Sequence, residues 1–399
     1  MKKIAVLIGI AFVDMLGFAM IFPLLPFYAL RLDAPEWVIG FLIASFSVAQ
    51  LTSAPIWGRM SDRFGRRPAL LVGLSASAIA FLVFGFATSI WMLFLSRIIQ
   101  GAGGGTTGVA QAYIGDAIAP RQRAKALGWL SAATSAGVMI GPAIGSLAFT
   151  LGPVWPGVVA ASLCVLNLGF AARWLPETSP ARTAGGPATP VGATHSIRAV
   201  IWDLLRAPNG EVAKLVWIYT IGMLGFMSMT AILALYLEQR FRVNEKSIFI
   251  FFVFTGATSI VMRAVILGKL VDWLGEIKVM RLGAASLAIG LATIPLPNSL
   301  PMLILMISFV PIGTALLFPS VTALVTHLVA DRDRGQALGV QQTFGGVSRV
   351  VAPIWSTAVF QAFGARVPFW VAAGIVALVV VLALRVGEPA REGVVAAAH

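Results

Sequence analysis

One acidic residue stands well inside a long apolar stretch of this sequence. Asp14 lies within a run from about residue 4 to residue 30, and no other acid lies so deep in an apolar run. A carboxylate among apolar side chains must be paired, protonated, or both in turn, because an isolated anion there is costly. Moving an arginine toward or away from it would load and unload a proton. Asp14 is therefore the candidate proton-coupling residue; a static ion pair and direct contact with a cationic substrate are the alternatives.

Three arginines also fall inside apolar runs, at Arg97, Arg263 and Arg349. A guanidinium keeps its proton at ordinary pH, so none of them can carry one, but each can stabilise an anion. Arg97 can tune a carboxylate, or be purely structural, and the sequence does not say whether Asp14 is its partner. Arg263 and Arg349 would bind an anionic group of a substrate, or pair with carbonyl groups and Asp14.

The segment Gly58–Arg67 gathers four arginines around a single acid, Asp62. Gly65 and Pro68 predict a tight turn followed by the start of a helix. The same frame of glycine, base, aspartate and glycine recurs 210 positions later in Gly268–Gly275. The alternative is a solvated basic loop with no further role. The four arginines are Arg59, Arg63, Arg66 and Arg67.

Glycines recur every four residues at Gly137, Gly141 and Gly145, with Pro142 beside them. On a helix this spacing makes one smooth stripe that allows a neighbouring backbone to approach closely. The proline removes a backbone hydrogen bond and favours a bend. Ordinary small-residue packing would use the same contact without any functional meaning.

The composition places these residues in a membrane protein. Hydrophobic residues make up 58% of the 399, charged residues only 11%, and mean hydropathy is +0.90. Soluble domains are about one quarter charged. Apolar runs long enough to cross a bilayer as helices recur along the chain. The single cysteine, Cys164, excludes a disulfide within the chain, and we expect no metal and no cofactor.

The apolar runs predict an all-α membrane protein with twelve transmembrane helices. The expected domains are a six-helix bundle at 1–175, a cytoplasmic linker at 176–212, a second bundle at 213–386 and a cytoplasmic tail at 387–399. Inside the linker, a short interfacial helix and a mere lead-in to the next span are equally plausible. The expected helices lie at about 4–30, 37–58, 69–88, 91–115, 126–150, 155–175, 213–238, 246–268, 279–297, 300–328, 335–363 and 367–386.

The charge distribution gives the expected orientation. With the N-terminus inside, cytoplasmic segments hold 21 of the 29 lysines and arginines, and outer loops hold five. This bias predicts that both termini are cytoplasmic and that the number of spans is even. The net charge of +13 is then a topology signal with some anionic-lipid contact, and we expect no nucleic-acid partner.

The two halves are related by sequence beyond the basic segment. Arg123–Gly128 matches Arg334–Gly339 at an offset of 211, and Pro142 matches Pro353 at the same offset. Two pseudo-symmetric six-helix bundles with a parallel repeat are expected, with a solute site in the cleft between them. We assign Phe18, Gln100, Arg263 and Arg349 to that cavity, although most aromatics at helical spacing simply lie in the core or face lipid.

These motifs resemble those of the major facilitator superfamily, specifically its twelve-helix drug:proton antiporter branch, which includes the bacterial tetracycline efflux proteins. The resemblance covers nearly the whole chain. One departure is the third helix, where no acid lies between Pro68 and Thr88, so the tetracycline substrate is not carried over. The motifs that carry the resemblance are Asp14–Pro26, Gly58–Arg67, Leu95–Gly101 and Gly137–Gly145.

The resemblance implies roles for these motifs. It gives Arg97 a part in proton coupling, and it suggests structure or coupling rather than substrate choice for Arg349. The helix-packing motif (Gly137, Gly141, Pro142 and Gly145) resembles that of exporters and favours outward transport. The basic segment would be a conformational latch that ties the second helix to the eleventh. The latch residues are Gly58, Asp62, Arg63, Gly65 and Arg66.

The sequence therefore predicts a proton-coupled exporter of small amphiphilic compounds such as drugs, working by alternating access as a monomer in the cytoplasmic membrane. An importer or facilitator of a polar or anionic metabolite is the alternative, favoured if Arg263 and Arg349 bind the substrate. No nucleophile or metal-ligand motif indicates an enzyme, and no phosphate-binding loop indicates nucleotide hydrolysis.

Overall fold

The structure is a computed structural model that describes residues 2–104, 106–118, 120–178, 210–330 and 333–387. Within those ranges every regular element is a helix. The first half of the chain forms α1 (Lys2–Ile21), α2 (Leu25–Arg31), α3 (Glu36–Phe64), α4 (Arg66–Gly85), α5 (Ile90–Gly103), α6 (Thr106–Ala117), α7 (Pro120–Phe149) and α8 (Trp155–Trp174).

The second half repeats this pattern with one addition, a π-helical segment in the second span. Its elements are α11 (Glu211–Phe241), α12 (Phe249–Val261), η1 (Met262–Ile266), α13 (Leu267–Leu274), α14 (Glu276–Thr293), α15 (Leu300–Ile307), α16 (Phe309–Leu328), α17 (Arg334–Phe363) and α18 (Val367–Leu384).

In the described part of the chain these elements form twelve helical arms, as the apolar runs predict. Several arms consist of two helices in series. The α1–α2 arm is interrupted around Pro23, which lacks a backbone N–H to continue a helix. The α5–α6 arm is interrupted at Gly104, at the end of a glycine-rich stretch. The remaining composite arms are α12–η1–α13 and α15–α16.

Nine helices in the described residues are long and apolar enough to span a membrane. The other three arms are too short or too polar to count as candidate spans. The α5–α6 arm is interrupted, and α14 carries Glu276, Lys278 and Arg281 within 18 residues. The third, α17, is rich in polar side chains such as Gln341 and Arg349.

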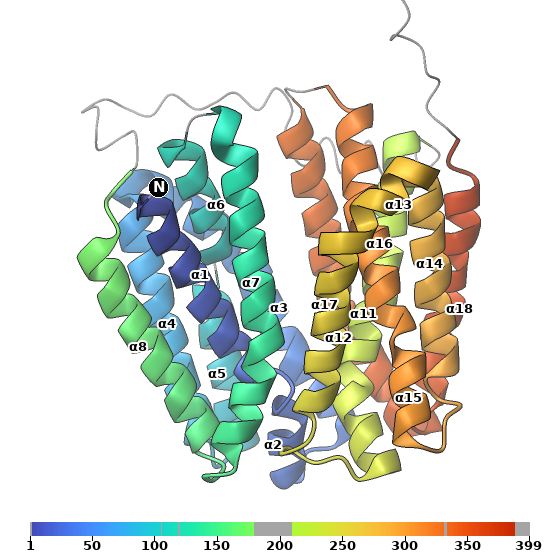
Figure 1. Cartoon of the computed structure of the whole chain (residues 1–399). Helices are drawn as coiled ribbons and strands as arrows, with labels where there is room; N and C mark the ends of the chain where they lie inside the picture. Colours follow the sequence, from blue (N-terminus) through green and yellow to red (C-terminus); the bar gives the residue numbers. More distant parts are fainter. Residues whose placement is uncertain (1, 105, 119, 179–209, 331–332, 388–399) are drawn as a thin grey trace, which may run out of the picture.

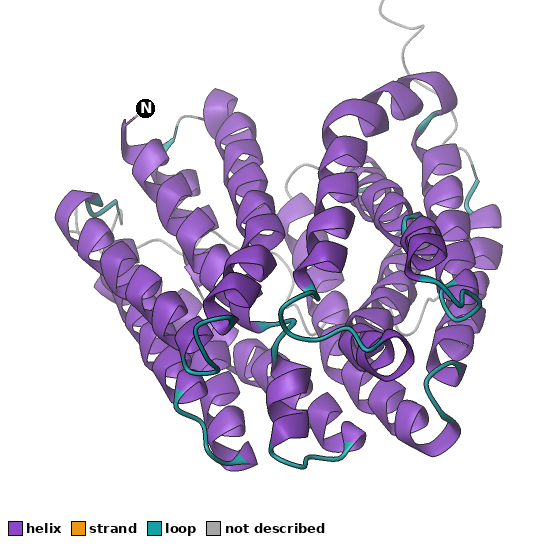
Figure 2. Cartoon of the chain, turned by 60° about the horizontal axis from the view of Figure 1, so that its bottom comes forward, coloured by secondary structure: helices purple, strands orange, loops and turns teal. Residues whose placement is uncertain are grey.

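The twelve arms form two bundles side by side, with α1–α8 in one and α11–α18 in the other (Figures 1 and 2). The bundles meet along two helix pairs, α3 with α17 and α7 with α12. Gly40 of α3 packs directly against Pro353 and Thr357 of α17, and Gly256 of α12 packs against Met139 of α7. The two-bundle architecture predicted from the internal repeat is confirmed.

The contacts between the bundles lie toward one face of the molecule. Arg31 pairs with Glu245 at 2.7 Å, and the Trp37 backbone N–H donates to Gln361 Oε1 at 3.1 Å. We call the opposite face, which carries the start of α1 and the segment Gly58–Arg67, the basic face. There the bundles separate (Figure 1), and positions such as Gly58 and Gly339 have no atom within 4 Å of a Cβ placed on them.

The structure confirms a tight turn followed by a helix start within Gly58–Arg67, but the helices expected at 37–58 and 69–88 extend further into this segment. The α3 helix continues to Phe64, the turn consists of Gly65 at φ 107°, and α4 begins at Arg66. Gly65 is the one residue between Gly58 and Arg67 at positive φ, a conformation that glycine adopts readily. The other residues of the segment are therefore free to continue the two helices. Most of the expected linker, with its interfacial helix, and nearly all of the expected tail lie outside the described residues.

Candidate functional site

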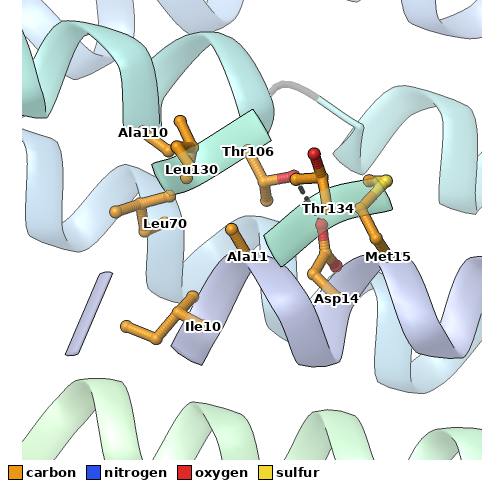
Figure 3. Close-up of a pocket in the computed structure, with 9 residues that line it drawn as sticks. All are labelled: Ile10, Ala11, Asp14, Met15, Leu70, Thr106, Ala110, Leu130 and Thr134. Atoms are coloured by element: carbon orange, nitrogen blue, oxygen red, sulfur yellow. Dashed lines mark hydrogen bonds between the residues drawn. The ribbon is translucent and has the colours of Figure 1, made fainter. Parts of the chain in front are cut away.

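Asp14 lies on α1 inside the first bundle and is only 8% exposed. One of its carboxylate oxygens accepts a hydrogen bond of 2.9 Å from the Thr106 hydroxyl, at the start of α6 (Figure 3). Among the described residues no lysine, arginine or histidine forms an ion pair with it. Asp14 is therefore a buried carboxylic acid held by a neutral donor rather than a member of a static ion pair.

A small pocket adjoins this carboxyl group. It lies between α1, α4, α6 and α7, and its only other polar groups come from Thr106 and Thr134 (Figure 3). Its size admits on the order of one water molecule. The remaining lining residues are Ile10, Ala11, Met15, Leu70, Ala110 and Leu130.

The glycine stripe of α7 packs against the helix that carries Asp14. A Cβ on Gly137 would lie 2.6 Å from the Phe12 carbonyl oxygen, and one on Gly141 would lie 2.7 Å from the Leu16 carbonyl oxygen. Gly145 similarly abuts the backbone of Met20. These distances are shorter than real carbon–oxygen contacts, so only glycine permits this approach. The stripe therefore determines where α1, and with it Asp14, lies.

Replacing Gly141 by leucine should be strongly disruptive. The side chain would have to displace Ala19 and the α1 backbone, and overpacking of this kind costs about 1–3 kcal/mol or more. We expect Gly141→Leu to lower the melting temperature of the purified protein and to abolish transport. Gly169→Leu on α8, where the glycine faces open space, is the matched control. A stable, fully active Gly141→Leu protein would show that the close approach is dispensable.

The structure does not bring Arg97 to Asp14. Arg97 lies on α5, nine residues before Thr106, a separation of roughly 13 Å along a helix. It is 1% exposed, donates to the Ser96 hydroxyl at 3.3 Å and lies 5.6 Å from the centre of the Phe84 ring. Its Nε has no hydrogen-bond partner in the described part of the chain. In this conformation the two expected coupling residues are separate features of one bundle.

The two arginines of the second bundle gather near one tyrosine. Arg263 lies in η1 and Arg349 in α17, and both lie within electrostatic range of Tyr219 on α11. The Tyr219 ring packs against Gly345 of α17. Both expected cavity arginines therefore lie near the same tyrosine.

The other two expected cavity residues belong to the first bundle. Phe18 of α1 is half-buried and packs with Phe22 and Phe46, at centroid distances of 5.7 and 5.2 Å. Gln100 of α5 is 4% exposed, and its side-chain oxygen has no partner among the described residues. An unpaired amide oxygen at this depth offers a hydrogen-bond acceptor to a solute or a water.

The Gly58–Arg67 segment forms an ionic chain within the first bundle. Arg66 pairs with Asp62 at 2.6 Å and with Asp116, at the end of α6, at 2.8 Å. The Glu177 carboxylate accepts from the backbone N–H groups of Arg66 and Arg67 at 2.9 and 3.2 Å, and so caps the start of α4. No hydrogen bond or ion pair joins this segment to α17 in the described residues, so the expected latch is not engaged here.

In the second half, the positions equivalent to Arg66 and Asp116 also form a pair, with the acid and the base exchanged. Glu276 lies 210 positions after Arg66, and His327 lies 211 positions after Asp116. The His327 Nδ1 is 3.2 Å from a Glu276 carboxylate oxygen. The repeat therefore preserves the position of this helix-end contact while exchanging the residue types.

Sequence reasoning missed Thr106 and Glu177, and it named Tyr219 only as one of several aromatics that could line a cavity. Thr106 could have been noticed as the first polar residue after the glycine-rich break at Gly103–Gly105. Glu177 lies three residues after the end of α8, and its use as a cap depends on a contact 110 residues away in sequence. No pattern in the sequence singles out Tyr219 from the other aromatics.

Comparison with known proteins agrees with this architecture. The tetracycline resistance protein of class G from Vibrio anguillarum is 27% identical over 365 residues, 90% of each chain. Multidrug resistance protein 1 of Bacillus subtilis is 27% identical over 392 residues, 97% of each chain. The crystal structure of the human organic anion transporter MFSD10 is 22% identical with a TM-score of 0.70, covering 96% of this chain and 99% of that one, which shows the shared fold.

A family comparison gives the same result. The model described as Major Facilitator Superfamily matches residues 7–298 and again residues 264–399. The two matches together cover both bundles, and their relatives are transporters rather than enzymes. The chain belongs to the major facilitator superfamily of secondary transporters.

Proposed function

We propose that this transporter exports small amphiphilic compounds, such as drugs, in exchange for protons. The observation that carries the proposal is Asp14, a buried carboxyl group with a neutral hydrogen-bond donor and no ion-pair partner among the described residues. Such a group can exist charged or neutral without breaking a structural ion pair. A proton can therefore load and unload there as the surroundings of α1 change.

The arrangement of the bundles supports alternating access. The bundles touch toward one face and separate toward the basic face (Figure 1), so a rocking motion about the α3–α17 and α7–α12 pairs would exchange the open side. In our proposal the basic face and both termini are cytoplasmic, in the cytoplasmic membrane, and the transporter works as a monomer. The Gly58–Arg67 segment would then engage α17 when the cytoplasmic side closes.

Arg97 would act on the proton site through its fixed charge and not as a carrier. It lies in the same bundle as Asp14, and α5 and α6 belong to one interrupted arm. A change at the Gly104 break would alter the spacing between the two residues. The relatives named above are tetracycline and multidrug resistance proteins, which supports export.

A second candidate is import or facilitated passage of a polar or anionic metabolite. The two arginines near Tyr219 support the anionic character of such a solute but not the direction of its transport. Transport assays in inverted membrane vesicles, over a panel of compounds with and without a pH gradient, separate the two. Export predicts uptake into inverted vesicles that requires an acidic interior. Equal uptake without a gradient, for every compound transported, would favour the second candidate.

A further inference from the structure

Two intramembrane guanidinium groups in the second bundle have no protein acceptor. Among the described residues, neither Arg263 nor Arg349 forms a hydrogen bond or an ion pair. Each guanidinium carries five N–H donors, and because the Arg263 side chain is exposed and that of Arg349 is half-buried, these donors are open to a solute. Arg349 is near the middle of the 30-residue helix α17, and Arg263 is similarly central in the arm Phe249–Leu274. At that depth neither side chain easily reaches the membrane surface.

The second bundle offers no carboxylate at this depth. Its described acids all lie at or next to the ends of its helical arms, and none forms an ion pair with either arginine. Two cations at membrane depth without a carboxylate partner are candidates for binding an anionic ligand. The described acids are Glu211, Glu238, Glu245, Asp272, Glu276 and Asp333.

The backbone at Arg263 is also unusual. Met262–Ile266 is a π-helical segment inserted between α12 and α13, and it contains neither proline nor glycine to account for it. A π-helical turn adds a residue to the helix and so changes the direction of the side chains around it. Such turns occur frequently at functional sites. This second observation, independent of the missing acceptors, points to the same residue.

The surface between the arginines combines polar and apolar groups. On α17, Gln342, Gly345 and Arg349 follow one another at spacings of three and four residues, so they share one face of the helix. Tyr219 packs on that face at Gly345. Its ring lies 5.2 Å from that of Phe318, which lies 6.3 Å from that of Phe226. An anion held by the arginines would therefore have an aromatic wall beside it.

We propose that Arg263, Arg349 and Tyr219 bind the anionic group of the substrate, and that this transporter therefore takes amphiphilic organic anions. A carboxylate or sulfonate on an aromatic body matches the two guanidinium forks and the aromatic wall. This inference rests on the proposed transport function and names its substrate class. It assigns substrate recognition to the second bundle and proton binding to Asp14 in the first.

The test is equilibrium binding to the purified protein, which needs no proton gradient. Isothermal titration calorimetry would compare 1-naphthaleneacetate with its neutral amide, for the wild type and for Arg263→Gln, Arg349→Gln and the double variant. Arg366→Gln, at an exposed arginine before α18, is the control for a general loss of positive charge. We expect the wild type and the control to bind the acetate about tenfold or more tightly than the amide.

Each glutamine variant should lose most of that preference, and the double variant should bind acetate and amide equally, with amide affinity unchanged. Absence of a preference in the wild type, or its survival in the double variant, would overturn the assignment. If a glutamine variant does not fold, Arg263→Lys and Arg349→Lys keep the charge but lose the planar fork, and should weaken acetate binding alone. Unchanged acetate binding by both folded lysine variants would also contradict the assignment.

Two further experiments distinguish anion recognition by the arginines from proton coupling and from lipid binding. The preference should persist in Asp14→Asn, so loss of proton coupling and loss of anion recognition are distinguishable. Binding is also measured in nanodiscs of phosphatidylcholine with and without phosphatidylglycerol. If phosphatidylglycerol displaces the acetate, a lipid phosphate occupies the arginines and the substrate assignment is wrong; unchanged binding supports it.

Discussion

Asp14→Asn is expected to abolish substrate accumulation driven by a pH gradient while leaving the protein folded and able to bind substrate. Asparagine keeps the size of the side chain and can still accept the hydrogen bond from Thr106, but it cannot take up a proton. Because no arginine pairs with Asp14 in the described residues, the change strands no cation. Stability should therefore stay within about 1 kcal/mol of the wild type.

The measurement pairs the melting temperature of the purified variant with substrate uptake in proteoliposomes, with and without an imposed gradient. Glu238→Gln, at an exposed acid near the end of α11, serves as the control and should transport normally. If Asp14 were instead half of a static ion pair, its removal would destabilise the protein by about 3–5 kcal/mol. A stable Asp14→Asn protein that still concentrates substrate in response to pH would remove Asp14 from the mechanism.

Asp62→Asn should reduce the transport rate by a factor on the order of ten. A small change in the free-energy difference between the two cavity orientations strongly changes their populations. Asp62 is the one acid within the Gly58–Arg67 segment, and it pairs with Arg66, which also binds Asp116. Without it, four arginines lie together with no acid among them, and closure of the basic face becomes unfavourable.

Arg59→Ala is the matched control for that prediction. Among the residues that the structure describes, the Arg59 side chain donates only to the Pro55 carbonyl within its own helix, at 3.3 Å, so its loss should have a smaller effect on transport. Both variants are compared at equal expression, using initial transport rates. Wild-type transport by a normally expressed Asp62→Asn protein would show that the segment does not act as a latch.

The sequence predicts most of the fold because lipid forces backbone groups into helices and the apolar runs mark their length. The expected helix at 335–363 is found as Arg334–Phe363, and the one expected at about 4–30 is found as α1 and α2 in series. The interruption at Gly104 and the π-helical turn at Arg263 were not predicted. Both depend on how neighbouring helices satisfy the displaced backbone groups, which local sequence does not record.

The candidate sites could be predicted only as separate residues. Asp14 stands out because it is an acid in an apolar run, and Arg97, Arg263 and Arg349 stand out for the same reason. Their partners depend on which helix faces which, so the Thr106 donor, the separation of Asp14 from Arg97, and the contact of Tyr219 with α17 required the structure. The glycine stripe predicts a close helix contact, but only the packing identifies α1 as its partner.

Proton flux that accompanies substrate flux is the decisive observation for exchange through Asp14. Purified transporter is reconstituted in liposomes that contain a pH-sensitive dye, and a substrate found by the vesicle screen is applied across the membrane without an imposed pH gradient. We expect substrate flowing down its gradient to drive protons the opposite way in the wild type, and to drive none in Asp14→Asn. Substrate flux without any proton flux in the wild type, or equal proton flux in both proteins, would contradict proton exchange at Asp14.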